Sequence, residues 1–298
     1  MKIYILPVPG FLQPQKQAMR YPSHNNDYDA EQDFLIWIKK QKHLLTNNHQ
    51  EANWHYLPVY WTRWHINHHF AAKGAGLKEL KAEVDKVIID DKKTFTIALF
   101  DGGILIDAGD TIVFNAGRTN NKAIDIPLIC KPHKKPIFKI EKKYLAAFNG
   151  SFETHPVRME IKKRFENNPE ILIGGCLPTI FYKRWFLGKS FNINIMSSYV
   201  ALCPRGTDCT SFRFFEAMQL GVAPCLISDR DVRPFKKFIP WDEMSYYVST
   251  VDELETLLLN NLDKNEAIQK GKKAAECWKE KLNFQKWCKY VLMELNEL

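Results

Sequence analysis

The sequence lacks any apolar run that approaches the roughly 20 residues a membrane-spanning helix needs, so we expect no such helix. The segment from Met1 to Pro7 has one lysine and a short apolar run, but no signal-peptide pattern with a cleavage site, and is better interpreted as a first strand. These two absences predict a cytoplasmic protein, and they leave open a peripheral contact with the inner face of a membrane.

Paired cysteines are also missing. The seven cysteines are an odd number, and no two of them form a Cys-x-x-Cys pair. This pattern indicates a reducing compartment and argues against a disulfide framework or a zinc site. His65 and His69 are four residues apart and could share a helical face, but no carboxylate or cysteine completes a metal-binding set around them. We therefore expect no metal and no other cofactor.

The charge is unbalanced, with a formal net charge of +8 at pH 7 over 298 residues. This excess of positive charge suits an anionic partner: a nucleotide sugar, a nucleic acid or an anionic membrane surface. The lysines are dispersed, and no DNA- or RNA-binding motif accompanies them, so a nucleic-acid partner is not expected. The plain alternative is a solvated basic surface.

The chain is long enough for two α/β domains. Short apolar runs alternate with helical patterns, which is typical of parallel sheets covered by helices. The expected strands are 1–8, 54–59, 94–100, 111–116, 144–148, 171–173, 200–204 and 223–228; the expected helices are 33–45, 77–88, 156–165, 212–220, 251–260, 264–282 and 284–297. A proline-rich break at 127–136 leads us to place the domains at 1–140 and 141–275, with 276–298 as a C-terminal helix that could pack back on the first domain.

The most informative segment is Leu202–Asp229, which predicts a strand, a polar loop, a helix, a glycine stop and a second strand. A helix N-terminus favours phosphate, and arginines beside it add bidentate contacts. Glu216 lies three residues after Arg213 on one helical face and could accept hydrogen bonds from ribose hydroxyls. The expected contacts of a nucleotide diphosphate here are Arg205, Gly206, Thr210, Ser211, Arg213, Glu216 and Asp229. Of these, Ser211 also suits the helix N-cap, and Asp229 could instead cap a loop.

A second glycine turn followed by a helix occurs at Gly150 and Ser151. Pro156 suits the first helical position, with Thr154 or His155 as the cap. Arg158 would then lie in the first turn, within reach of a diphosphate, although a surface arginine is the plain alternative.

The Leu202–Asp229 segment and its continuation resemble the exostosin family of glycosyltransferases. The resemblance rests on Ser211–Ala217, Gly221, Ser228–Asp229, Pro234–Phe235 and Trp241, with weaker echoes at Phe148–Gly150, Arg158 and Ile126–Cys130. Arg233 departs from the family pattern, which usually has an apolar residue there. The resemblance implies a GT-B architecture, with two Rossmann-like α/β domains that face a cleft. It also implies an inverting transfer, in which the acceptor hydroxyl displaces the nucleoside diphosphate.

An inverting transfer needs a base, and the sequence identifies it less clearly. Asp101 ends an expected strand and precedes two glycines, so it is the first candidate, although Asp-Gly is also a common turn signal. Glu153 and His133 follow as candidates. Tyr60, Trp61 and Trp64 could stack on acceptor sugars or could be core residues.

The function that we predict is an inverting, metal-independent glycosyltransferase that moves a sugar from a nucleotide sugar, preferably UDP-linked, to a glycan or glycolipid acceptor. Two alternatives remain at this stage. The chain could be a catalytically inactive GT-B protein that binds a glycan or nucleotide, or another GT-B nucleotide-sugar enzyme of the epimerase or hydrolase type.

Overall fold

The computed structural model describes residues 1–15, 30–117, 123–130, 132, 133, 135, 139–175 and 191–298. The chain folds into two compact units, one made of Met1–Ile129 with Phe284–Leu298 and the other of Cys130–Asn283. Each unit holds its own five-stranded sheet, and all strand pairs within both sheets are parallel. The α/β class with two Rossmann-like units is thereby confirmed.

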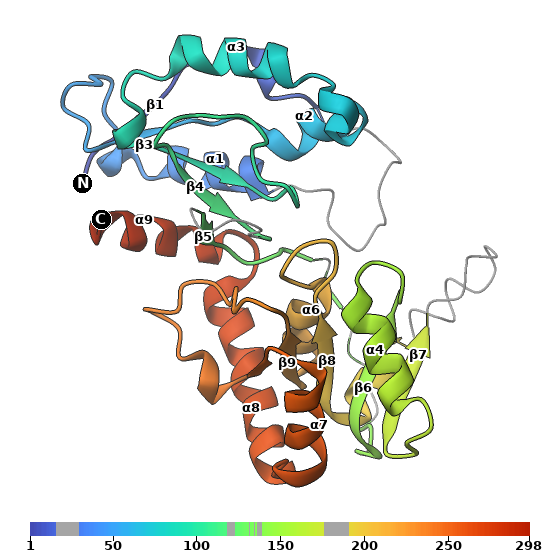
Figure 1. The fold of residues 1–298 in the computed structure, drawn as a ribbon. Coiled ribbons are helices and arrows are strands. Elements are labelled where there is room, and N and C mark those ends of the chain that lie inside the picture. The colour runs from blue at the N-terminus through green and yellow to red at the C-terminus, as the bar shows by residue number, and fades with distance from the viewer. Residues whose placement is uncertain (16–29, 118–122, 131, 134, 136–138, 176–190) are drawn as a thin grey trace. The chain divides into compact units, whose positions relative to one another are not determined.

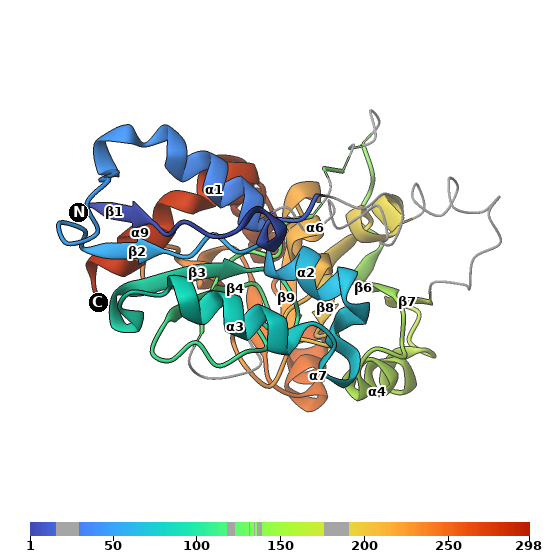
Figure 2. The ribbon, with the colours of Figure 1, turned by 90° about the horizontal axis from the view of Figure 1, so that it is seen from above.

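The sheet of the first unit places its strands in chain order: β1 (Ile3–Ile5), β2 (Trp54–Tyr56), β3 (Thr94–Ala98), β4 (Ile112–Asn115) and β5 (Ile124–Asp125). Helix α3 (Leu77–Val87) covers one face of this sheet, and α1 (Ala30–Lys40) with α9 (Cys288–Asn296) covers the other (Figures 1 and 2). Every residue of β3 is buried, as expected for a strand covered on both faces.

The C-terminal segment belongs to the core of the first unit. The ring of Phe34 on α1 lies 5.0 Å from that of Tyr56 and 6.0 Å from those of Phe95 and Trp287. Trp287 itself is fully buried. The short turn Phe284–Trp287 and the α9 helix that follows it therefore complete the apolar layer under α1.

The sheet of the second unit has the order β7-β6-β8-β9-β10. Its strands are β6 (Tyr144–Gly150), β7 (Ile171–Gly175), β8 (Ser198–Pro204), β9 (Ala223–Ile227) and β10 (Tyr246–Val248). The order reverses between β6 and β8. In open α/β sheets, ligands bind outside the carboxyl ends of the strands at such a reversal. The loops that follow β6 and β8 are therefore the first place to look for a site.

Capping residues determine where the two helices next to that reversal begin and where α6 ends. The His155 ring accepts a hydrogen bond from Val157 N at the start of α4 (Pro156–Phe165), and Ser211 Oγ accepts one from Arg213 N at the start of α6 (Phe212–Leu220). Gly221 ends α6 with a φ of +76°, a conformation that favours glycine. All three caps match the sequence prediction.

Helices cover both faces of the second sheet. Helices α6 and α8 (Lys264–Cys277) pack on β8 and β9, while α4 packs on β7 and on α7 (Val251–Asn260) (Figure 1). The buried side chains between them form one apolar core, which includes Phe148, Ile161, Phe165, Leu202, Leu254 and Leu258.

The structure corrects the sequence prediction at several elements. The sequence does not predict helix α2 (Trp61–Asn67), because its polar residues Thr62, Arg63 and His65 are buried along with its apolar ones and no exposed polar face distinguishes it. The short edge strands β5 and β10 were also missed. The expected helix 264–282 ends at Cys277 and continues as a π-helical turn, Trp278–Leu282. Among the helices of the described ranges, none is long and apolar enough to cross a membrane.

Candidate functional site

Arg158 joins the two loops that meet at the reversal of strand order. This buried guanidinium donates from Nη1 to Ser151 O (2.9 Å) after β6, and from Nη2 to Pro204 O (3.0 Å) at the end of β8. Its Nε donates to the next carbonyl, Arg205 O (2.8 Å). These three hydrogen bonds hold the two loops together. The direct phosphate contact that the sequence suggested for Arg158 stays a prediction, because a guanidinium has five N–H donors.

The loop from Arg205 to Ser211 packs closely against Arg158. Gly206 N donates to Thr210 O (3.3 Å), which folds the loop back on itself. A Cβ built on Gly206 would lie 3.3 Å from Arg158 Nη2, tighter than most contacts of real Cβ atoms. A larger residue here would require the Arg158 side chain to shift by a few tenths of an ångström. Thr210 and Ser211 of the same loop are buried.

Arg205 projects from the end of β8 and pairs with Asp229, which follows β9. Nη1 of Arg205 contacts Asp229 Oδ1, and Nη2 donates to Thr207 O (3.4 Å). Burial alone would raise the pKa of Asp229, but the hydrogen bond and charge of Arg205 outweigh it, so that pKa lies below its ordinary value. The Nε of Arg205 is buried and has no hydrogen-bond partner in the described part of the chain.

Glu216 is a buried carboxylate with a cation or donor on each oxygen. Its Oε2 pairs with Arg213 Nη1, and its Oε1 lies 3.1 Å from His133 Nε2. Burial would raise the pKa of Glu216, yet the charge of Arg213 and the hydrogen bond from His133 lower it to about 2. Glu216 is therefore ionised at neutral pH, and each oxygen keeps lone-pair capacity for a ligand hydroxyl.

Arg213 links the start of α6 to the end of β6. Its Nε donates to Asn149 O (2.7 Å), and its guanidinium lies 4.7 Å from the centre of the Phe191 ring. The same ring is 5.5 Å from that of His133. Arginine, histidine and phenylalanine thus form a layer over Glu216, and Asn149 and Phe191 are site residues that the sequence did not reveal.

His133 anchors the segment that opens the second unit. Its backbone N donates to Gln219 Oε1 (2.8 Å), and Gln219 Nε2 contacts Cys130 Sγ (3.0 Å). Gln219 lies three residues after Glu216 on the same face of α6, a spacing that could have identified it. Because Cys130 and His133 are tied to α6, they group with the second unit, whereas the sequence placed them in the first.

The family model for the exostosin GT47 domain matches residues 1–261. The chain belongs to the exostosin GT47 domain family. Similar curated proteins include the probable beta-1,4-xylosyltransferase IRX10 of Arabidopsis thaliana and a probable glucuronosyltransferase of Oryza sativa subsp. japonica. Each is 32% identical over 111 residues, which cover 37% of this chain and 24% of the relative.

The likeness to solved structures is weaker. A crystal structure of S. aureus TarM in complex with fondaparinux, alpha-GlcNAc-glycerol and UDP covers 74% of this chain and 59% of its own, with 12% identity and a TM-score of 0.39. A second TarM structure gives 13% identity and a TM-score of 0.38.

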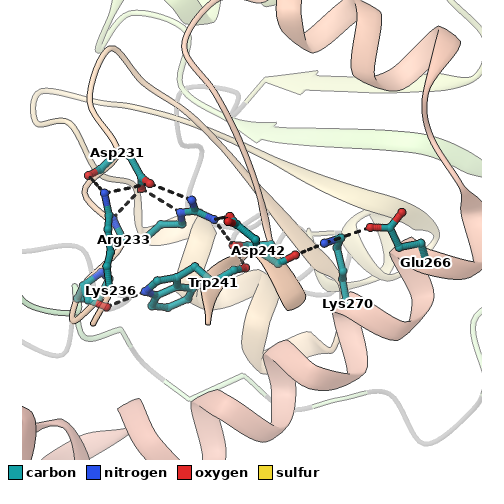
Figure 3. A network of polar contacts seen from close by, with 9 residues as sticks. Asp231, Arg233, Lys236, Trp241, Asp242, Glu266 and Lys270 are labelled. Atoms are coloured by element: carbon teal, nitrogen blue, oxygen red, sulfur yellow. Dashed lines mark hydrogen bonds and ion pairs between the residues drawn. The ribbon is translucent and has the colours of Figure 1, made fainter. Parts of the chain in front are cut away.

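Arg233, the departure from the exostosin pattern, anchors the loop that follows Asp229. Figure 3 shows its guanidinium between Asp231 on one side and Asp242 on the other. Nη2 lies 2.8 Å from Asp231 Oδ2, while Nη1 lies 2.9 Å from Asp242 Oδ1 and 3.1 Å from Ser245 Oγ. At this position the buried Arg233, paired with Asp231 and Asp242, replaces the apolar residue that is usual in the family.

In the first unit, Asp101 lies in an exposed turn after β3. The turn is held by Gly103 N, which donates to Phe100 O (2.8 Å), and by Asn115 Nδ2, which donates to Ala98 O (3.1 Å) and Phe100 O (3.0 Å). The residues that follow, Gly102 to Gly109, line a cavity of about 260 Å³. Of the other two candidate bases, Glu153 is exposed in the turn after β6, and His133 is bonded to Glu216.

Two aromatic candidates for acceptor stacking are core residues instead. Trp61 is fully buried and donates from Nε1 to Thr96 Oγ1 (2.8 Å), and Trp64 is 4% exposed. Helix α2 ends at Asn67, so His65 and His69 do not share a helical face. Within the described residues, no group of three or more His, Cys, Asp or Glu side chains could hold a metal ion.

Proposed function

We propose that this protein is an inverting glycosyltransferase that moves a sugar from a UDP-linked donor to a glycan or glycolipid acceptor. One observation supports this most strongly. Arg205, Arg213 and the N-terminus of α6 gather at the carboxyl ends of β6 and β8, and within the described residues Arg205 Nε has no hydrogen-bond partner. Membership in the exostosin family and relatives named as xylosyl- and glucuronosyltransferases agree with it.

The proposed chemistry is a direct displacement. An acceptor hydroxyl attacks the anomeric carbon, its proton passes to a base, and the bond from that carbon to the diphosphate oxygen breaks. Fixed cations and the positive end of the α6 helix dipole stabilise the charge that develops on the leaving diphosphate, so we propose no metal in this step. Asp101 is the base that we propose, because its carboxylate is exposed beside an open, glycine-rich turn.

The donor site is tested by titrating the purified protein with UDP in a calorimeter, in buffer with EDTA. We expect binding without a divalent metal, and we expect Arg205→Met to weaken it about 10- to 100-fold, since a charge-assisted bond contributes about 1.5–3 kcal/mol. Lys236→Met is the matched control, because it removes one positive charge from the neighbouring loop. If both variants weaken UDP binding equally, Arg205 does not contact the nucleotide.

The base is tested by Asp101→Asn with UDP-sugars of the xylosyl and glucuronosyl type. We expect this variant to bind UDP normally and to lose transfer by at least about 100-fold, because positioned proton transfer contributes about 10²–10⁴-fold. Asp110→Asn, another exposed aspartate of the same loop region, is the control. UDP binding without turnover in the unmodified protein would favour the inactive binding protein, and release of free sugar alone would favour a hydrolase.

A further inference from the structure

Arg230 carries a positive charge that pairs with no carboxylate of the described residues. It follows Asp229 in the loop after β9, and its side chain is half-buried. Its backbone N donates to Ser228 Oγ (3.4 Å), but within the described part of the chain its buried Nη1 has no hydrogen-bond partner. A guanidinium binds carboxylates and phosphates through two parallel hydrogen bonds, so Arg230 is a candidate contact for an anionic group of a ligand.

The two aspartates that flank Arg230 are already paired with other cations. Asp229 pairs with the guanidinium of the arginine that follows β8. Asp231 Oδ2 lies 2.8 Å from Arg233 Nη2 and 2.9 Å from Lys236 Nζ (Figure 3). Each carboxylate is thus matched by at least one cation of its own, and the charge of Arg230 is left over.

The charge of Arg230 lies next to the loop between β8 and α6. Burial raises the pKa of Cys209 in that loop, and the charges of Arg205 and Arg230 act in the opposite direction. Burial would also raise the pKa of Asp229, but Arg205 and, less strongly, Arg230 lower it. Because interactions between charges weaken with distance, Arg230 and Arg205 are neighbours at the carboxyl ends of β9 and β8.

The order of the strands gives the direction of a bound donor. Glu216, whose oxygens can accept from ribose hydroxyls, pairs with Arg213, and Arg213 is bonded to the end of β6. Arg205 follows β8, and Asp229 and Arg230 follow β9, the next strand of the sheet. In a nucleotide sugar the diphosphate lies between the ribose and the sugar. A donor with its ribose at Glu216 and its diphosphate at Arg205 therefore has its sugar at the β9 end.

We propose that Arg230 binds a carboxylate on the donor sugar, so that the preferred donor class is a UDP-linked uronic acid. The sixth carbon of a uronic acid carries two charged oxygens that match the fork of a guanidinium, whereas a neutral hexose has a single hydroxyl there. A hydrogen bond to a charged group also contributes more than one between neutral groups. This assignment rests on the proposed UDP site, because the position of the diphosphate determines where the sugar lies.

The test is calorimetric titration of the full chain with UDP, UDP-glucose and UDP-glucuronic acid in buffer with EDTA. The two sugars differ only in the group on the sixth carbon. We expect UDP-glucuronic acid to bind at least about tenfold more tightly than UDP-glucose. Arg230→Gln should reduce this preference to about twofold or less and should leave the affinity for UDP within about twofold. Arg230→Glu should reverse the preference, because two negative charges then face each other.

Lys236→Gln is the matched control, because it removes one positive charge from the same loop while Arg233 still holds Asp231. We expect it to keep the preference for UDP-glucuronic acid. If the unmodified protein binds both sugars equally, if Arg230→Gln keeps the preference, or if it weakens all three ligands alike, the uronic acid assignment is overturned while the UDP site stands. If UDP itself does not bind, the proposed function fails and this assignment fails with it.

Discussion

Replacing Glu216 with glutamine is expected to lower the free energy of unfolding at pH 7 by about 3 kcal/mol. The folded-state pKa of about 2, against the ordinary 4.5, means that the folded protein favours the ionised carboxylate by about that amount. Glutamine keeps the shape but removes the charge that Arg213 and His133 face, which leaves the half-buried guanidinium of Arg213 without its balancing carboxylate. Chemical denaturation followed by tryptophan fluorescence measures the difference.

The pH dependence of the free energy of unfolding shows whether the loss of stability in Glu216→Gln comes from the ionised carboxylate. A depressed pKa adds stability that is fully present above the unfolded pKa of about 4.5 and disappears as the pH falls through 4.5 toward 2. The gap between the two proteins should therefore be constant from pH 7 to about pH 5 and should narrow below it. Glu255→Gln, which breaks an exposed pair with Arg164, is the matched control and should change the midpoint little. A gap that does not depend on pH would contradict the ionised state of Glu216.

The second large effect is expected from Arg158→Met. This change removes three hydrogen bonds to the carbonyls of Ser151, Pro204 and Arg205, and each carbonyl left unsatisfied costs about 1–3 kcal/mol. We expect a loss of at least about 3 kcal/mol in the free energy of unfolding. UDP binding should also weaken more than tenfold, because Arg158 holds the loops after β6 and β8 in their relative positions.

The variant Arg158→Lys tests whether the positive charge of Arg158 or the planar shape of its guanidinium stabilises the loops. A lysine keeps the positive charge, but its compact ammonium cannot reproduce the planar fork that reaches three carbonyls in different directions. We therefore expect it to restore little stability. Arg164→Met on the same helix α4 is the control, since Arg164 forms ion pairs with the exposed carboxylates Asp252 and Glu255. Equal losses for Arg158→Met and Arg164→Met would show that Arg158 does not brace the loops.

The local elements of the second unit could be predicted from the sequence because their signals are local. Pro156 after His155, Ser211 before an apolar helix and Gly221 after it all act through the nearest backbone groups, and each cap is found in the structure. Hydrophobic period likewise indicated α3, α4 and α7 to within a residue or so. Helix α2 gave no such signal, because it is buried on all sides.

The partners of each site residue depend on residues distant in the chain. Arg158 is 47 residues from Arg205, and His133 is 83 residues from Glu216, yet each pair is joined by a hydrogen bond. Residue type and spacing predicted arginines near a phosphate, but they could not distinguish an arginine that bonds to the backbone of two loops from one that pairs with a carboxylate. That difference depends on which carbonyls lie within 3 Å of the guanidinium.

By itself, the sequence determined the α/β class, the strand, loop and helix around Arg205–Glu216, and the resemblance to the exostosin family, because periodicity, capping and short motifs are written in neighbouring residues. Only the tertiary structure decided that Arg158 holds two loops together, that Arg205 Nε has no hydrogen-bond partner among the described residues, and that Trp61 and Trp64 are core. Burial and hydrogen-bond partnership arise when segments distant in the chain come together, as β6 and β8 do around Arg158, and no local pattern records that pairing.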